Sequence, residues 1–338
     1  MEVQLKDYFY YSQDGLIFSN RIQAIEYKIK TKKEIYFYYN DDFWSKLNWK
    51  VEPEGSLDFH YKMQAQRIRD EYDYVILCYS GGYDSTNILE TFHYNNIKLD
   101  KILITGAFSK DQQKPSDINH NGEIYLNAFP CIKELDLEKI TQVFDYSDMY
   151  SDVTQFSLYK LEETWVEKIG SRCSPHHFFW RDMDKYIVPK EFENKKVAIL
   201  FGIDKPYLIE NNTFYFNDLA ATAYGNYNRE KNNVDVIPFY WDTKYPLILL
   251  KQLHFLKNNP LLQYDQDSVA HAVYNLKNQL SFKSGKSNNP LLAKRDTFFL
   301  KQKDTKLYDF YTHSIKRINS SEFIKEIKMI KTKKYAII

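Results

Sequence analysis

The feature that most constrains the fold is a continuous apolar run, residues 74–79, which is followed at once by Ser80, Gly81 and Gly82. A run of this kind without polar alternation is typical of a strand that is buried on both faces of a parallel sheet. Ile88, Leu89 and Phe92 follow at helical spacing. The pattern therefore predicts a strand, a glycine-rich turn and a helix, which together form the repeating unit of α/β folds.

Residues 101–106, 141–146 and 196–201 are further apolar runs that predict buried strands. Helical patterns lie between them, at residues 124–135 and 158–169. Alternating strands and helices favour an α/β domain with a doubly wound, Rossmann-like parallel sheet, which we place at residues 61–258.

The segments on either side of this domain have a different character. Residues 1–60 contain a turn signal at Asp14-Gly15 and a β-like run at residues 34–39, so we expect a small β-rich annex. Residues 259–338 are polar and rich in lysine, and we expect a mainly helical C-terminal region.

Charge and cysteine content narrow the class of protein. A net charge of +1 makes nucleic acid an unlikely partner, because nucleic-acid binders usually carry a basic excess. The three cysteines are far apart, which supports neither a zinc knuckle nor a disulfide framework. No signal-like segment and no apolar run of about 18 residues is present, so we expect a cytoplasmic protein without a membrane partner.

The turn at residues 80–86 has the chemistry of an anion site. Its glycines let the backbone approach a ligand closely, and successive N–H groups next to a helix N-terminus attract phosphate. Asp84 would repel a polyphosphate unless a divalent cation lay between them, and Mg²⁺ is usually held by one or two carboxylates and phosphate oxygens. Asp204 follows another predicted strand and is the candidate second ligand.

The segment Ser80-Gly81-Gly82-Tyr83-Asp84-Ser85 resembles the SGGxDS loop of the N-type ATP pyrophosphatases, the PP-loop superfamily. Within it, the chain is most similar to the synthetase domain of asparagine synthetase and β-lactam synthetase. This resemblance implies an adenine nucleotide α-hydrolase-like fold that binds ATP and Mg²⁺. It implies metal ligation by Asp84 and Asp204. The predicted nucleotide-binding residues are Cys78, Ser80, Gly81, Gly82, Asp84, Ser85, Thr86, Thr105 and Gly202.

The chain departs from the family in two ways. Glutamine-dependent asparagine synthetases have a nucleophilic cysteine after the first methionine, where this chain has Glu2. The annex is also too short for a glutaminase domain, so ammonia or an amine would come from solution or from a partner. The family's longer acidic second motif is reduced to residues 202–206, which leaves the substrate open.

We therefore expect an AMP-forming ligase that adenylates a small carboxylate substrate, with Asp84 and Lys205 as catalytic residues. Lys205 is equally compatible with a solvated loop position. An enzyme that modifies a nucleobase or tRNA, and a nucleotide-binding module without turnover, are the alternatives. Asp242 and His254 flank strand ends and are candidates for the substrate side or for structural roles. The sequence indicates no oligomeric state.

Overall fold

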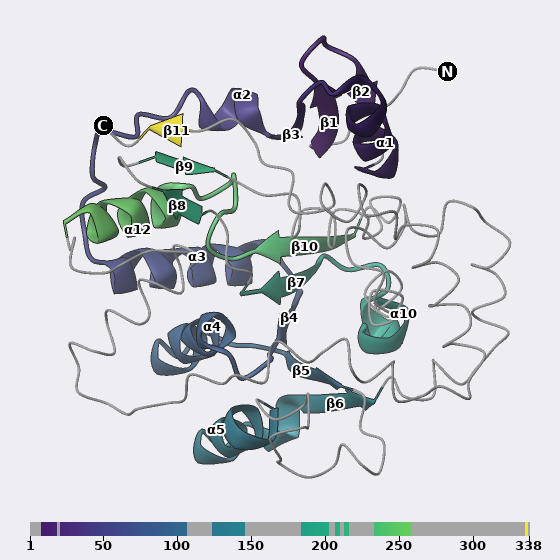
Figure 1. Ribbon diagram of the computed structural model, residues 1–338. Helices are drawn as coiled ribbons and strands as arrows, with labels where there is room; N and C mark the ends of the chain where they lie inside the picture. The colour runs from purple at the N-terminus through teal and green to yellow at the C-terminus, as the bar shows by residue number, and fades with distance from the viewer. Residues whose placement is uncertain are drawn as a thin grey trace, which may run out of the picture.

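The computed structural model describes residues 8–18, 21–106, 124–145, 184–202, 207–209, 213–215, 233–258 and 335–336 (Figure 1). The expected helix at 158–169 and almost all of the expected C-terminal region lie outside these residues, so both stay predictions. None of the helices within the described ranges is long and apolar enough to cross a bilayer.

A parallel five-stranded sheet forms the centre of the molecule. Its strands, in chain order, are β4 (Tyr74–Cys78), β5 (Lys101–Gly106), β6 (Thr141–Asp145), β7 (Val197–Phe201) and β10 (Val234–Pro238). The first four coincide with the predicted apolar runs to within one residue at each end. β10 was not expected. The parallel sheet with its helices is an α/β, Rossmann-like arrangement, as the sequence predicts.

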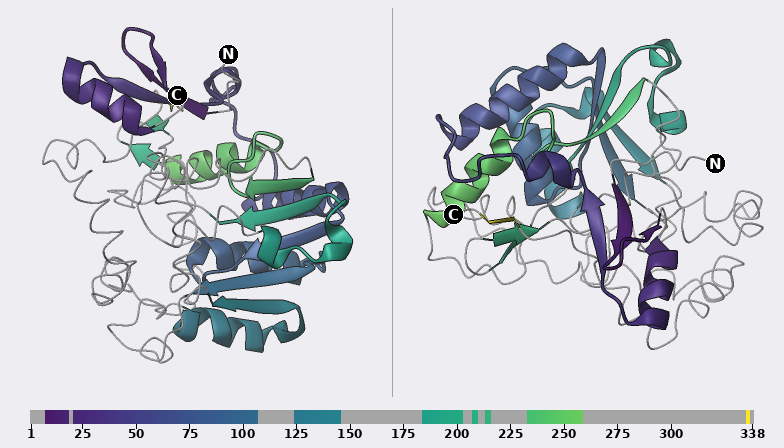
Figure 2. Two further views of the ribbon diagram at one scale, coloured as in Figure 1. Left: turned by 90° about the vertical axis from the view of Figure 1, so that its right-hand side faces the viewer. Right: turned by 90° about the horizontal axis from the view of Figure 1, so that it is seen from above.

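Helices cover both faces of this sheet. One face carries α3 (Leu57–Glu71), α4 (Tyr83–Tyr94), α5 (Phe129–Glu134) and α12 (Leu247–Lys257). The other face carries the short helix α10 (Asp184–Ile187) and a 3₁₀ turn, Lys190–Phe192. In the left view of Figure 2, α10 lies in front of the sheet and the blue helices lie behind it.

Strand geometry divides the core into two clusters. Successive side chains of a strand point to opposite faces, so Val75 and Leu77 join the core under α3 and α4, whereas Ile76 and Cys78 join the core on the α10 side. β4 is fully buried along its length, as the unbroken apolar run predicts.

The helix that precedes β4 is α3. Its N-cap Ser56 accepts a hydrogen bond from the N–H of Phe59 at 3.1 Å, which satisfies one of the backbone donors that a helix start leaves unpaired. Its apolar face, which includes Tyr61, Ala65 and Ile68, is buried. The predicted helix at 124–135 is a π-helical turn, Ile124–Ala128, that continues into α5.

Two small antiparallel sheets lie outside the central one. The first has the order β2-β1-β3 and consists of β1 (Tyr8–Ser12), β2 (Ile17–Phe18) and β3 (Ile35–Tyr39). The helix α1 (Arg21–Thr31), which was not expected, connects β2 to β3, and α2 (Asp41–Trp44) follows β3. The second has the order β11-β9-β8 and consists of β8 (Tyr207–Ile209), β9 (Thr213–Tyr215) and β11 (Tyr335–Ala336).

Candidate functional site

The strand order places a topological switch point between β4 and β7. The sheet has the order β10-β7-β4-β5-β6, so the chain adds β5 and β6 on one side of β4 and later adds β7 and β10 on the other. Ligands of open α/β sheets bind outside the carboxyl ends of the strands at such a point. The last residues of the two strands, Cys78 and Phe201, are direct register partners, and residues 80–85 and Gly202 follow them.

The 80–85 loop is closed by its own hydroxyl groups. Ser85 Oγ donates to the carbonyl of Gly82 at 3.1 Å and accepts from the N–H of Ser80 at 3.3 Å. Because the Ser85 proton is used in this way, the contact of 3.2 Å between the hydroxyls is a donation from Ser80 to Ser85. Ser80 Oγ in turn accepts from the N–H of Gly82 at 3.2 Å.

These contacts indicate different roles for Ser80 and Ser85. Ser85 is buried and its hydroxyl is engaged three times inside the loop, so its main effect is on the loop's shape. Ser80 is exposed, and its hydroxyl can turn towards a ligand. Gly81 has φ of 82°, a left-handed conformation that glycine adopts without strain.

Helix α4 begins directly after this loop. Its N-cap Gly82 has no side chain to cap the first turn, and the N–H groups of a first turn have no acceptor within the helix. Together with the helix dipole they attract an anion at the carboxyl end of β4. Asp84 lies in this first turn, and one oxygen of its carboxylate is buried.

Gly202 brings the end of β7 against this turn. A Cβ at position 202 would lie 2.7 Å from the carbonyl carbon of Asp84 and 2.7 Å from the amide nitrogen of Ser85. No real Cβ approaches backbone atoms so closely, so only glycine lets β7 lie against the Asp84–Ser85 peptide. Gly202 was one of the predicted nucleotide-binding residues, and the structure brings it to the loop.

Tyr240, which sequence reasoning missed, also reaches this peptide. Its hydroxyl donates to the carbonyl oxygen of Asp84 at 2.6 Å and accepts from Asn87 Nδ2 at 3.0 Å. Tyr240 follows β10, a strand that the sequence analysis did not assign. Its only local signal was the apolar cluster Phe239-Tyr240-Trp241, which indicates burial but no partner.

The other predicted residues are placed as follows. The Cys78 side chain lies in the core on the α10 side, so it presents no thiol to the loop. Thr86 Oγ1 lies 3.3 Å from the hydroxyl of Tyr79 beside the loop. Thr105 is near the end of β5, next to β4 on the side away from β7. Asp204 and Lys205 lie outside the described residues.

Two weakly acidic side chains beside the loop, Cys78 and Tyr79, have a raised pKa. Burial raises the pKa of the Cys78 thiol well above its usual range. Burial also raises the pKa of Tyr79, and its contact with Cys131 adds to the shift. Neither residue therefore adds negative charge near the loop at neutral pH, which suits an anion site.

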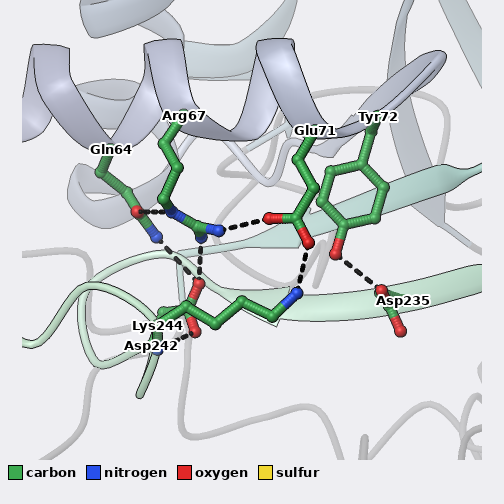
Figure 3. A network of polar contacts seen from close by, with 7 residues as sticks. All are labelled: Gln64, Arg67, Glu71, Tyr72, Asp235, Asp242 and Lys244. Carbon is green, nitrogen blue, oxygen red and sulfur yellow. Dashed lines mark hydrogen bonds and ion pairs between the residues drawn. The ribbon is translucent and has the colours of Figure 1, made fainter.

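Asp242 and His254, two candidates for the substrate side, hold the fold together instead. Asp242 is paired with Arg67 of α3, accepts from Gln64 Nε2 at 3.1 Å and accepts from the N–H of Lys244 at 2.9 Å (Figure 3). His254 is buried, and its Nε2 lies 3.0 Å from the carbonyl oxygen of Trp49. The contacts of Asp242 and His254 are thus those of residues with a structural role.

The residues present fit a diphosphate and a magnesium ion. The left-handed Gly81, the uncapped turn after Gly82 and the exposed Ser80 hydroxyl give donors and close access at one point. Within the described part of the chain, no three His, Cys, Asp or Glu side chains gather as a protein-only metal site requires. Mg²⁺ needs just one or two protein carboxylates when phosphate oxygens and water complete its shell, so Asp84 is compatible with it.

Comparisons with known proteins do not assign this chain to a family. No protein-family model matches the sequence, and no curated protein matches it. The functional conclusion therefore rests on the loop, on its place in the sheet and on the contacts around it.

Proposed function

We propose that this chain is an ATP-dependent, AMP-forming ligase of the PP-loop type, with an adenine nucleotide α-hydrolase-like domain. One observation carries the proposal: the SGGxDS segment lies at the switch point between β4 and β7, with Gly202 packed on its Asp84–Ser85 peptide. A glycine-rich turn that only joins a strand to a helix would require neither this place in the sheet nor this close approach.

The proposed reaction has two steps. A carboxylate oxygen of a small substrate attacks the α-phosphorus of ATP, the bond to the bridging oxygen of the β-phosphate breaks, and pyrophosphate leaves. The nitrogen of ammonia or of an amine then attacks the acyl carbon of the adenylate, loses a proton, and AMP leaves. No oxidant or further co-reactant is needed.

Each residue has a part in this proposal. The exposed Ser80 hydroxyl and the amides of Gly81, Tyr83 and Asp84 bind the leaving pyrophosphate, and Ser85 keeps the loop in shape. Asp84 and Asp204 would hold a magnesium ion, which would neutralise charge on the leaving group. Lys205 adds a positive point charge. Thr105 and Gly202 lie near the nucleoside, while Cys78 and Thr86 support the loop from its two ends.

The test is an assay of products. We expect the chain, incubated with α-labelled ATP, Mg²⁺ and a panel of small carboxylic acids with an ammonium salt, to release AMP and pyrophosphate in equal amounts with one class of acid. Asp84→Asn should lower this rate about 100-fold, the order of loss seen when one group that stabilises transition-state charge is removed.

Asp145→Asn is the matched control. Asp145 is the exposed last residue of β6, at the same edge of the sheet but two strands away from β4, so this variant should keep the rate of the wild type. Release of ADP in place of AMP would refute the proposal. Binding of ATP without turnover on any acid would favour the nucleotide-binding module, and AMP release only with tRNA or a nucleobase would favour the alternative acceptor.

A further inference from the structure

The Asp84 peptide is held from two neighbouring strands. Gly202, after β7, lies against its carbonyl carbon, and the Tyr240 hydroxyl, after β10, donates to its carbonyl oxygen. An ordinary helix needs no such help in its first turn, because this carbonyl accepts from an N–H one turn later. The second donor therefore fixes the position of the peptide beyond what helix formation requires.

Tyr240 is itself held rigidly. It is 1% exposed, and its ring lies against the rings of Tyr61 and Phe239. Asn87 Nδ2 donates to its hydroxyl, which leaves the single hydroxyl proton for the Asp84 carbonyl. The direction of the donation is thus set by α4 itself.

The segment that carries Tyr240 is anchored at both ends. Before it, the N–H of Phe239 donates to the carbonyl of Phe201 at 3.2 Å, which continues the pairing of β10 with β7. After it, Asp242 is paired with Arg67 of α3. Tyr240 therefore connects a fixed part of the sheet to the first turn of α4.

We propose that Tyr240 is a positioning residue that fixes the Asp84 peptide, and with it the carboxylate, in the position relative to Ser80, Gly81 and Gly82 that a metal-bound nucleotide requires. The inference rests on the proposed function, since it gives the Asp84 carboxylate a metal to hold. Tyr240 acts through the backbone of Asp84 and touches no substrate.

The experiment compares dissociation constants for ATP with Mg²⁺ and for ATP with a chelator, by calorimetry, in the wild type, Tyr240→Phe and Tyr72→Phe. Tyr72 is the control because it is also a buried tyrosine whose hydroxyl is bonded to β10, at 2.6 Å from Asp235, at the other end of the strand. Tyr240→Phe should weaken binding of Mg·ATP about 10-fold, the usual size of the effect when a residue that orients a metal ligand is lost. Metal-free ATP should bind as it does to the wild type, and Tyr72→Phe should change neither constant.

An equal loss for Mg·ATP and metal-free ATP in Tyr240→Phe would overturn the inference, because a merely structural role would affect both. If Tyr240→Phe does not fold, Asn87→Ala, which removes the donor to the Tyr240 hydroxyl, should show the same metal-dependent loss to a smaller degree. An unchanged Mg·ATP constant in that variant would also overturn the inference.

A failure of the proposed function gives a different result. If the wild type binds no ATP, the ligase proposal fails. The positioning role of Tyr240 is then tested by amide hydrogen exchange in the ligand-free protein. Tyr240→Phe should then speed exchange in the first two turns of α4, whereas Tyr72→Phe should not. Identical amide exchange rates in all three proteins would contradict the positioning role of Tyr240.

Discussion

At position 202 the chain has room for a hydrogen atom but not for a methyl group. The atoms that crowd this position belong to the backbone of Asp84 and Ser85, so no side-chain rotation relieves the contact. The glycine in the sequence therefore has a packing reason, which is separate from the role that the family resemblance gives it.

Gly202→Ala should lower the free energy of unfolding by about 1–3 kcal/mol, the usual cost of overpacking a tightly packed site. Urea denaturation measures this. Ser80→Ala is the control, since it changes the same site without adding an atom. It removes only the hydrogen bonds of an exposed hydroxyl and should lower the free energy of unfolding by about 1 kcal/mol or less. A Gly202→Ala protein as stable as the wild type would show that β7 can move away from α4 without cost.

At the scale of helices and strands, the central strands could be predicted from the sequence because strands buried on both faces need unbroken apolar runs. β10 was missed because it is an edge strand whose short apolar run is interrupted by Asp235 and ends in Pro238. α1 was missed because its isoleucines and Tyr27 have high strand propensity, although Ala24 and Ile25 are buried on one side of it.

The residues of the candidate site also fall into those that the sequence could predict and those that it could not. The 80–85 loop could be predicted because its glycines, hydroxyls and carboxylate are contiguous in the chain. The contact of Tyr240 with Asp84 could not, because it depends on which strand lies beside β7, and no local pattern encodes that neighbour. Asp204 and Lys205 remain predictions.

The ion pair that joins α3 to the turn after β10 gives a prediction at this scale. The Asp242 side chain is 10% exposed and pairs with Arg67, whereas the Lys244 side chain is 52% exposed and pairs with Glu71. Asp242→Ala should cost about 3 kcal/mol of unfolding free energy, because it leaves Arg67 partly buried without this partner. Lys244→Ala should cost less than about 1 kcal/mol. Equal costs for the two variants in chemical denaturation would contradict this ranking.

For the whole molecule, stability should fall in two stages as the pH is lowered. His60 is buried between the Glu54 carbonyl, 2.8 Å from Nε2, and the Tyr245 hydroxyl, 3.1 Å from Nδ1. Burial lowers the pKa of His60 below its ordinary 6.5, so the unfolded chain takes up the proton first and stability declines below that pH. A hydrogen bond from Lys251 lowers the pKa of Glu52 below 4.5, so its contribution is lost at more acidic pH.

Urea midpoints measured between about pH 7.5 and about pH 5.5 isolate the first stage. His60→Gln should be less stable at neutral pH, but its midpoint should change much less over this range than that of the wild type. A slope identical to that of the wild type would assign the first stage to another group.

The contacts of Gly202 and Tyr240 with the Asp84 peptide also have a consequence for the order of assembly during translation. Gly202 and Tyr240 are synthesised long after the loop they hold, and β4 gains its second neighbour only when β7 has left the ribosome. A nascent chain that ends after β6 contains the full SGGxDS segment, but β4 is then a bare edge open to wrong pairing. The proposed phosphate-binding loop is thus completed only by the later half of the domain, and a fragment that carries the motif alone would lack the contacts that hold it.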